Sequence, residues 1–183
     1  MRIISGQYKG RSLPVVPRLF KARPTTDFAK ENLFNILQNI VDLESVTVLD
    51  LFAGTGGISY EFASRGAESI DSVEIEPVHF NYIKKTAEAL GFKQMHVIRN
   101  DAFRFLDFCK KTYDIIFADP PYDNKKINLI PQQVFKNNLL NENGYLIIEH
   151  SVDTDFSENE YFFEQRKYGS VNFSFFKEKI LAD

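Results

Sequence analysis

The sequence predicts an α/β fold in which a mostly parallel sheet carries helices on both faces. Short apolar runs alternate with helical patterns between residues 46 and 150, which is typical of parallel strands joined by helices. After residue 150 the pattern changes to alternating aromatic and polar residues around Gly169, which predicts an antiparallel hairpin at one edge of the sheet. The 183 residues suffice for one domain with a core of its own.

Each expected element has a local signal. Thr26 or Asp27 can cap a helix over 27–41, because their side chains can accept a hydrogen bond from a free backbone N–H group of the first turn. Pro77 and Gly91 mark the two ends of a helix over 77–90. Further helices are expected over 57–65, 102–111 and, despite Pro131, about 127–140. Strands are expected over 46–51, 69–75, 95–98, 113–118 and 145–150, with the hairpin over 161–176.

The N-terminal segment is expected to be a small hairpin extension. Residues 2–5 and 12–16 flank a turn that contains Gly6 and Gly10, and residues 17–25 follow as an extended loop. We therefore expect a single domain over 1–183, with a basic hairpin or arm over 1–26 and an α/β core over 27–183.

Charge is distributed unevenly along the chain. Residues 1–30 carry seven basic residues against Asp27 alone, a net charge of +6, whereas the remainder carries 15 basic and 24 acidic residues, a net charge of −9. A basic arm on an acidic body suggests a local contact with a polyanion such as nucleic acid. The alternative is a solvated tail that happens to be basic.

Several classes of protein are excluded by composition. The single Cys109 rules out an intramolecular disulfide and a multi-cysteine zinc site, and the three histidines lack metal-binding spacing, so no metal is expected. The N-terminal apolar run is too short for a signal peptide, and no stretch reaches the roughly 18 apolar residues that span a bilayer. We expect a cytoplasmic protein.

The segment VLDLFAGTGGIS (48–59) predicts a ligand-binding turn between a strand and a helix. Its glycines let a ligand approach the backbone, and the helix N-terminus offers free N–H groups. A Gly-Lys-Ser/Thr sequence for triphosphates is absent, and Ser59 stands where a dinucleotide site has a third glycine. Asp50 would repel a pyrophosphate and attract an ammonium, such as that of a methionine moiety. A tight turn without a ligand is the alternative.

Three more acids follow predicted strands. Glu74 can accept both hydroxyls of a ribose, or it is a solvated acid at a strand end. Asp101 can accept an exocyclic N–H of adenine, or Asn100 or Asp101 simply caps the helix from residue 102. Asp119 opens the segment DPPY (119–122), where two prolines stiffen a loop whose carbonyls are expected to face outward without local partners. Carboxyl ends of parallel strands meet at one edge, so these acids and Asp50 are expected to line one crevice.

VLDLFAGTGGIS, VEIE, NDA and DPPY, in this order, resemble the class I S-adenosylmethionine-dependent methyltransferases, and DPPY resembles the enzymes that methylate exocyclic amino groups. RIISGQYKGRSL (2–13) and RPTTDFAKENLFNIL (23–37) are similar to the bacterial family that methylates guanine N2 in 16S ribosomal RNA. The resemblance covers about residues 2–176. It implies a doubly wound, Rossmann-like sheet, S-adenosylmethionine as cofactor and the small ribosomal subunit as partner. The sequence carries no signal of oligomeric state, and a monomer is the default expectation.

The resemblance also implies roles for particular residues. The catalytic residues expected are Asp119, Pro120, Pro121 and Tyr122. The cofactor-binding residues expected are Thr25, Thr26, Asp27, Asp50, Phe52, Ala53, Gly54, Thr55, Gly56, Glu74, Ile75, Asp101 and Ala102. The RNA-binding residues expected are Lys9, Arg11, Arg18, Lys21, Arg23 and Lys30, with Lys30 in place of a family arginine.

Three other functions remain open at this stage. An adenine-N6 methyltransferase shares DPPY, but 183 residues leave no room for the recognition domain of a sequence-specific DNA enzyme. An RNA-binding assembly factor could keep the fold without catalysis, although the intact acids argue against it. A nicotinamide oxidoreductase is disfavoured by Ser59 and by DPPY.

Overall fold

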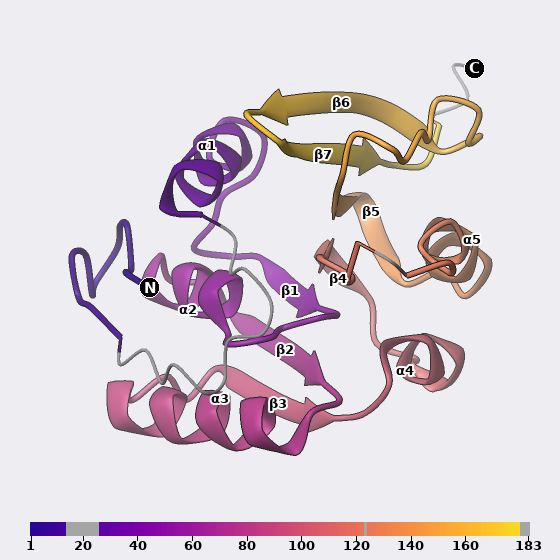
Figure 1. Cartoon of the computed structure of the whole chain (residues 1–183). Coiled ribbons are helices and arrows are strands. Elements are labelled where there is room, and N and C mark those ends of the chain that lie inside the picture. The colour runs from indigo at the N-terminus through magenta and orange to yellow at the C-terminus, as the bar shows by residue number, and fades with distance from the viewer. Residues whose placement is uncertain (14–25, 123, 180–183) are drawn as a thin grey trace.

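The computed structural model describes residues 1–13, 26–122 and 124–179, and these residues form one sheet between two groups of helices (Figure 1). The helices are α1 Asp27–Leu37, α2 Gly57–Ser64, α3 Pro77–Leu90, α4 Ala102–Phe108 and α5 Leu129–Lys136. The strands are β1 Thr47–Asp50, β2 Ser69–Glu74, β3 Met95–Arg99, β4 Tyr113–Ala118, β5 Leu140–His150, β6 Phe162–Tyr168 and β7 Val171–Phe176.

The sheet has the strand order β3-β2-β1-β4-β5-β7-β6. Strands β1 to β5 pair in parallel, and β7 pairs antiparallel with both β5 and β6. This confirms the predicted doubly wound α/β fold with an antiparallel C-terminal hairpin at one edge.

Both faces of the central strands β1, β2 and β4 are buried, each against its own set of helices. In Figure 1, α1, α2 and α3 lie on one side of the sheet and α4 and α5 on the other. Neighbouring residues along a strand point to opposite faces, so Val48 joins the core under α1–α3 while Leu49 joins the core under α4 and α5. Burial on both faces explains why the central strands read as nearly continuous apolar runs.

Three helices are shorter than predicted by several residues, among them α4, which ends at Phe108 instead of residue 111. Helix α1 begins as expected, since the Thr26 hydroxyl accepts a hydrogen bond from the backbone N–H of Ala29 at 3.1 Å, but it ends at Leu37 instead of residue 41. Helix α5 is confined to Leu129–Lys136, and Pro131 falls in its first turn, where a missing N–H group costs little. No helix among the described residues is long and apolar enough to cross a membrane.

The N-terminal segment packs along α2 and is not a regular hairpin in its described part. Arg2 and Ser12 form an isolated antiparallel bridge, and residues 14–16 of the predicted second strand lie outside the described residues. Gly6 lies in the turn with a φ of +80°, and a Cβ atom there would lie 1.9 Å from the carbonyl oxygen of Ser64. Only glycine therefore allows this approach to α2.

Glu61 of α2 fastens the N-terminal segment to the core. Its side chain is fully buried and accepts hydrogen bonds from the backbone N–H groups of Ile4 at 2.8 Å and Ser5 at 2.9 Å. The Arg65 guanidinium lies 2.9 Å from one carboxylate oxygen and the Lys30 ammonium 3.7 Å from the other. One buried carboxylate thus joins the N-terminal segment, α1 and α2.

Replacing Glu61 by Gln should lower the free energy of unfolding by about 3–5 kcal/mol, because it leaves Arg65 without its counter-charge and Lys30 with only the partly exposed Asp27. An amide also offers one acceptor oxygen where two backbone N–H groups need acceptors. Urea unfolding monitored by circular dichroism measures the change. The matched control is Glu164→Gln, whose partner Arg166 is half exposed, and it should cost less than about 1 kcal/mol. Equal effects of the two variants would contradict the role of Glu61.

Candidate active site

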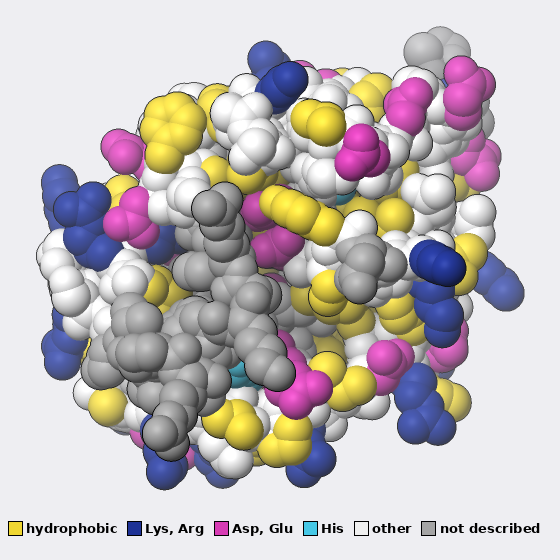
Figure 2. All heavy atoms as spheres, viewed as in Figure 1, with side chains coloured by type: hydrophobic (Ala, Val, Ile, Leu, Met, Phe, Trp, Pro, Cys, Tyr) yellow, Lys and Arg dark blue, Asp and Glu magenta, His cyan; other side chains and the backbone are white. Residues whose placement is uncertain are grey.

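Four acidic residues that the sequence places after strands come to the same edge of the sheet. β1 ends at Asp50 and β2 at Glu74, while Asp101 follows β3 and Asp119 follows β4 directly. The parallel registers, with Asp50 opposite both Ser72 and Phe117, place these strand ends side by side. The space-filling view shows acidic side chains in a hollow near the middle of one face of the molecule (Figure 2).

The glycine turn after β1 is held tightly by the neighbouring strands. The backbone N–H of Leu51 donates to the Phe117 carbonyl at 2.9 Å, and that of Ala53 donates to the Val73 carbonyl at 3.0 Å. Gly56 has a φ of +81°, and a Cβ atom there would lie 2.7 Å from the ring of Tyr60. The backbone of the turn is therefore held in place without a ligand, and its glycines carry no side chains that would cover it.

Glu74 connects the glycine turn to the start of α3. One carboxylate oxygen accepts the backbone N–H of Gly54 at 2.8 Å, and the other accepts that of Glu76 at 2.7 Å. Each carboxylate oxygen has a second lone pair, so these two bonds leave acceptor capacity for hydroxyl groups. The carboxylate is 7% exposed and is held in one orientation at the strand end.

Asp50 lies beneath the glycine turn with almost no exposure to solvent. The Ser59 hydroxyl donates to its carboxylate at 2.6 Å and lies 2.8 Å from the Ser72 hydroxyl. Burial raises the pKa of Asp50 to about 7; the Ser59 hydrogen bond opposes this shift and the charge of Glu74 adds to it. A nearby ammonium would stabilise the ionised form of this buried carboxyl group, because the positive charge offsets the cost of ionising it.

Asp101 caps helix α4. Its carboxylate accepts the backbone N–H of Arg104 at 3.0 Å, so the capping alternative is confirmed. A carboxylate retains other lone pairs while it caps a helix, and a contact with an adenine N–H stays a prediction. Beside it, the rings of Phe52 and Phe103 meet edge to face with centroids 6.1 Å apart. Ala102 is buried and Ile75 is 55% exposed.

The start of α1 is tied to the glycine turn through the first two residues of the chain. Asp27 lies 3.5 Å from the Arg2 guanidinium, and the Thr55 hydroxyl lies 3.6 Å from the sulfur of Met1. These contacts bring Thr26 and Asp27 towards the side of the sheet edge where Thr55 lies. The third predicted residue of this segment, Thr25, lies outside the described residues.

The segment after β4 turns from the core to the surface within four residues. Pro120 is buried, Pro121 is exposed, and Tyr122 exposes 62% of its surface. The expectation of carbonyls without local partners is wrong for Pro121, whose carbonyl accepts the backbone N–H of Asn124 at 2.8 Å. This bond closes a turn and holds the exposed Tyr122 within it.

The structure corrects the role predicted for Lys30. Its ammonium is 3% exposed, donates to the carbonyl of Arg2 and pairs with Glu61, so it does not face a phosphate. Burial lowers the pKa of Lys30, and the charges of Glu61 and Asp27 oppose that shift. The sequence shows a lysine near other basic residues but not the buried carboxylate across the fold that takes up its charge.

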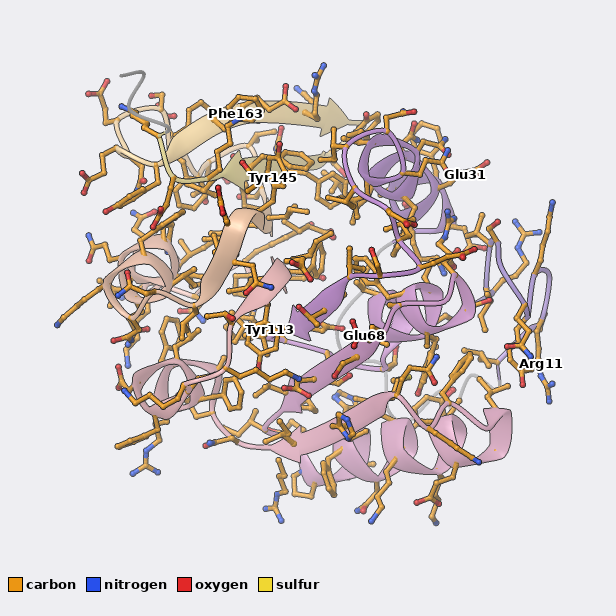
Figure 3. All side chains as sticks on the ribbon, turned by 180° about the vertical axis from the view of Figure 1, so that it is seen from behind. Arg11, Glu31, Glu68, Tyr113, Tyr145 and Phe163 are labelled. Carbon is orange, nitrogen blue, oxygen red and sulfur yellow. The ribbon has the colours of Figure 1, made fainter. Side chains whose placement is uncertain are left out.

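Lys9 and Arg11 are exposed but do not lie beside the strand-end acids. Their turn packs against the C-terminal ends of α2 and α3, since Tyr8 donates from its hydroxyl to the Leu90 carbonyl. Helix α2 spans about 12 Å, and it separates this turn from the glycine turn. Figure 3 shows Arg11 at the outer edge of the molecule. Arg18, Lys21 and Arg23 lie outside the described residues.

Two surface hollows lie elsewhere. One of about 470 Å³ lies between α5 and residues 158–161, and one of about 400 Å³ lies between α3 and β3. Neither contains a predicted site residue, so the strand-end edge remains the candidate site.

The sequence had not indicated Ser59 and Ser72 as partners of Asp50. The only available signal was a pair of small hydroxyl residues in otherwise buried elements.

The strand order, the glycine turn after β1 and the acids at the strand ends define a class I S-adenosylmethionine-dependent methyltransferase. A family model described as conserved hypothetical protein 95 matches residues 1–177. The chain belongs to this family.

Named relatives agree with this class. The chain is 35% identical over 149 residues to Ribosomal RNA small subunit methyltransferase D of Buchnera aphidicola, covering 81% of this chain and 75% of the relative. It is 31% identical over 189 residues to the protein of the same name from Haemophilus influenzae, covering 97% and 93%. A solved structure described as a putative methyltransferase from Escherichia coli has 29% identity, a TM-score of 0.82 and 96% coverage of both chains.

Replacing Asp50 by Asn should remove a pH dependence from folding. In an unfolded chain an aspartate has a pKa of about 3.9, whereas burial raises the pKa of Asp50 to about 7. Between these values only the folded state holds the proton, so the contribution of Asp50 to the free energy of unfolding falls as pH rises to about 7 and is level above. The free energy of unfolding of the variant, relative to wild type, should rise by about 2–3 kcal/mol from pH 5 to pH 8.

Urea unfolding at the two pH values measures this difference. The control variant Glu164→Gln, at a surface acid that pairs with Arg166, should follow the wild type at both pH values. If Asp50→Asn kept the full pH dependence of the wild type, the raised pKa of Asp50 would be contradicted.

Proposed function

We propose that this protein transfers a methyl group from S-adenosylmethionine to the exocyclic N2 of a guanine in 16S ribosomal RNA. The observation that carries this proposal is the position of Asp119-Pro120-Pro121-Tyr122. The segment follows β4 directly, at the edge where Asp50 and Glu74 also end their strands. Relatives named as small-subunit ribosomal RNA methyltransferases support the choice of substrate.

The strand-end acids suit the parts of the cofactor in turn. Asp50, with its raised pKa, suits the ammonium of the methionine moiety, and Glu74 suits the ribose hydroxyls. Asp101 is assigned to the adenine amino group, with Ala102, Phe52 and Ile75 lining the base. The backbone of Ala53, Gly54, Thr55 and Gly56 is assigned to the methionine moiety, with Thr25, Thr26 and Asp27 closing that side.

The acceptor amine needs orientation more than it needs a strong base. Its lone pair is delocalised into the purine, so it attacks only when its hydrogens are held and the lone pair points at the methyl carbon. S-adenosylmethionine supplies that methyl group as an electrophile. We assign the two N–H groups to the Asp119 carboxylate and the Pro120 carbonyl. The carboxylate also stabilises the positive charge that develops on nitrogen and can take the proton afterwards.

Tyr122 is assigned to stack on the target base. Its ring is 62% exposed and its segment is held by the Pro121–Asn124 turn, so little ordering is needed when a base arrives. A guanine in folded RNA reaches the site only when it is unstacked or flipped. Stacking on an aromatic ring offsets part of that cost, by roughly 1–3 kcal/mol.

The remaining assignments follow from the substrate. We take the protein to be a cytoplasmic monomer that acts on the small ribosomal subunit. The exposed Lys9 and Arg11 are assigned to phosphates at a distance from the target nucleotide, together with Arg18, Lys21 and Arg23. Lys30 has no such role, because its charge is used inside the fold.

The test of this function is a transfer assay. The protein is incubated with radiolabelled S-adenosylmethionine and small subunits that lack the modification, and the RNA is digested to nucleosides. Label in N2-methylguanosine is expected. Label in N6-methyladenosine would keep the chemistry but replace the substrate, and absence of label despite cofactor binding would overturn catalysis on this RNA.

Replacing Asp119 by Asn should lower kcat by about 10²–10³-fold while the dissociation constant of the cofactor stays near that of wild type. The amide keeps the shape of the side chain but loses the charge that stabilises the developing cation. Single-turnover transfer and calorimetric titration of the cofactor measure the two quantities. The matched variant is Asp101→Asn, which can still cap α4 and should weaken cofactor binding more than transfer. If Asp119→Asn lost affinity for the cofactor but transferred methyl normally once the cofactor was bound, the assignment of Asp119 to the acceptor amine would be contradicted.

A further inference from the structure

An aromatic pair stands on the surface close to the candidate site. Phe28, in the first turn of α1, exposes 62% of its surface. Its ring centroid lies 6.4 Å from that of Tyr168, and the ring planes meet at 78°. Tyr168 in turn packs on the buried Phe173 at 6.2 Å, so the pair has a fixed inner ring and an exposed outer ring.

Strand register places this pair at the active-site edge. Tyr168 precedes the turn between β6 and β7, and that turn lies beyond the pairing of His150, the last residue of β5, with Asn172. β5 pairs with β4 up to Ala118, the residue before Asp119. Tyr168 ends β6, which is three strand spacings from β4, so about 15 Å separates the line of Asp119 from the line of Tyr168. Figure 1 shows this turn beside the first turns of α1.

The surroundings of the pair are polar and partly basic. Lys167 is exposed next to Tyr168, and Arg166 lies opposite Phe173 on the strand face that also carries Tyr168. Arg166 pairs with Glu164 at 2.7 Å, and the two side chains are 53% and 29% exposed. Such an exposed pair is weak, so Arg166 can exchange its carboxylate partner for a phosphate. An exposed ring beside cations is the combination that binds unpaired nucleotides.

Flipping the target base out of a helix leaves a neighbouring base that this surface could bind. When the target nucleotide enters the site, its neighbour in the strand loses a stacking partner. A ring that packs on Tyr168, three strands from β4 at the same edge of the sheet, lies where the next nucleotides of an extended strand can pass. We propose that Phe28, supported by Tyr168, is a stacking site for an unpaired base that flanks the target nucleotide. This inference rests on the proposed RNA methyltransferase function and adds a second base contact to it.

The test compares three variants. Phe28→Leu keeps apolar bulk but removes the flat ring, whereas Phe28→Trp keeps a ring. The matched control is Phe163→Leu, at an aromatic residue of β6, the strand that carries Tyr168; Phe163 is 47% exposed. Phe163 lies beside Tyr145 (Figure 3), and its neighbour Phe162 pairs with Phe176, at the end of β6 away from the turn.

Phe28→Leu should raise the KM for small subunits by about 5- to 150-fold, the range that loss of one stacked base produces. kcat at saturating RNA and the dissociation constant of the cofactor should change by less than about twofold. Phe28→Trp should restore the wild-type KM, and Phe163→Leu should match wild type throughout. Stacking involves no phosphate contact, so the slope of log affinity against log salt should be the same for Phe28→Leu and wild type.

The outcomes separate this inference from the proposed function. The stacking site is overturned if Phe28→Leu has the KM of the wild type, or if Phe163→Leu raises the KM as much as Phe28→Leu does. In either case methylation by the wild type would still support the proposed function. A raised KM with assembled subunits but unchanged affinity for the deproteinised RNA would assign the surface to a ribosomal protein instead. If the wild type transfers no label, the proposed function fails. Phe28 is then tested by affinity for single-stranded RNA alone, where an unchanged value in Phe28→Leu overturns the inference.

Discussion

The parallel pairing of β1 with both β2 and β4 is the constraint on which the rest of the structure depends. These pairings bring the carboxyl ends of the three strands to one edge and leave Asp50 in the centre of it. They also hold the glycine turn, because the N–H groups of Leu51 and Ala53 donate to the strands on either side. A displaced strand would move both an acid and the turn, so the site and the sheet are specified together.

The central acids are stabilised by neutral donors rather than by cations. Ser59 donates to Asp50, and the backbone of Gly54 and Glu76 donates to Glu74. Neutral donors orient a carboxylate without cancelling its charge, so the charge remains available to a cationic or hydroxylic ligand. An ionised Asp50 in this buried position lowers the free energy of unfolding, as its raised pKa indicates. A cofactor that binds the folded state raises the free energy of unfolding again.

The N-terminal segment has a structural role as well as a basic surface. Its backbone donates to the buried Glu61, which also pairs with Lys30 of α1 and with Arg65 at the end of α2. Its first residue contacts Thr55 in the glycine turn. Part of the charge that suggested contact with RNA is thus used to hold α1 and α2 together. What α1 presents near the site is the exposed ring of Phe28, an apolar surface suited to bases more than to phosphates.

The sequence by itself determined the order of the elements, the helix starts at Thr26 and Pro77, and the acids at the strand ends, because these depend on local periodicity, capping and strand polarity. Element ends were less certain: α1 stops at Leu37 and α5 is confined to Leu129–Lys136, since packing decides where a helix ends. Only the tertiary structure decided that Lys30 is buried against Glu61 and that Lys9 and Arg11 lie at the far end of α2. Burial, pairing and distance between charges depend on residues far apart in the chain, and a linear pattern of charge does not contain them.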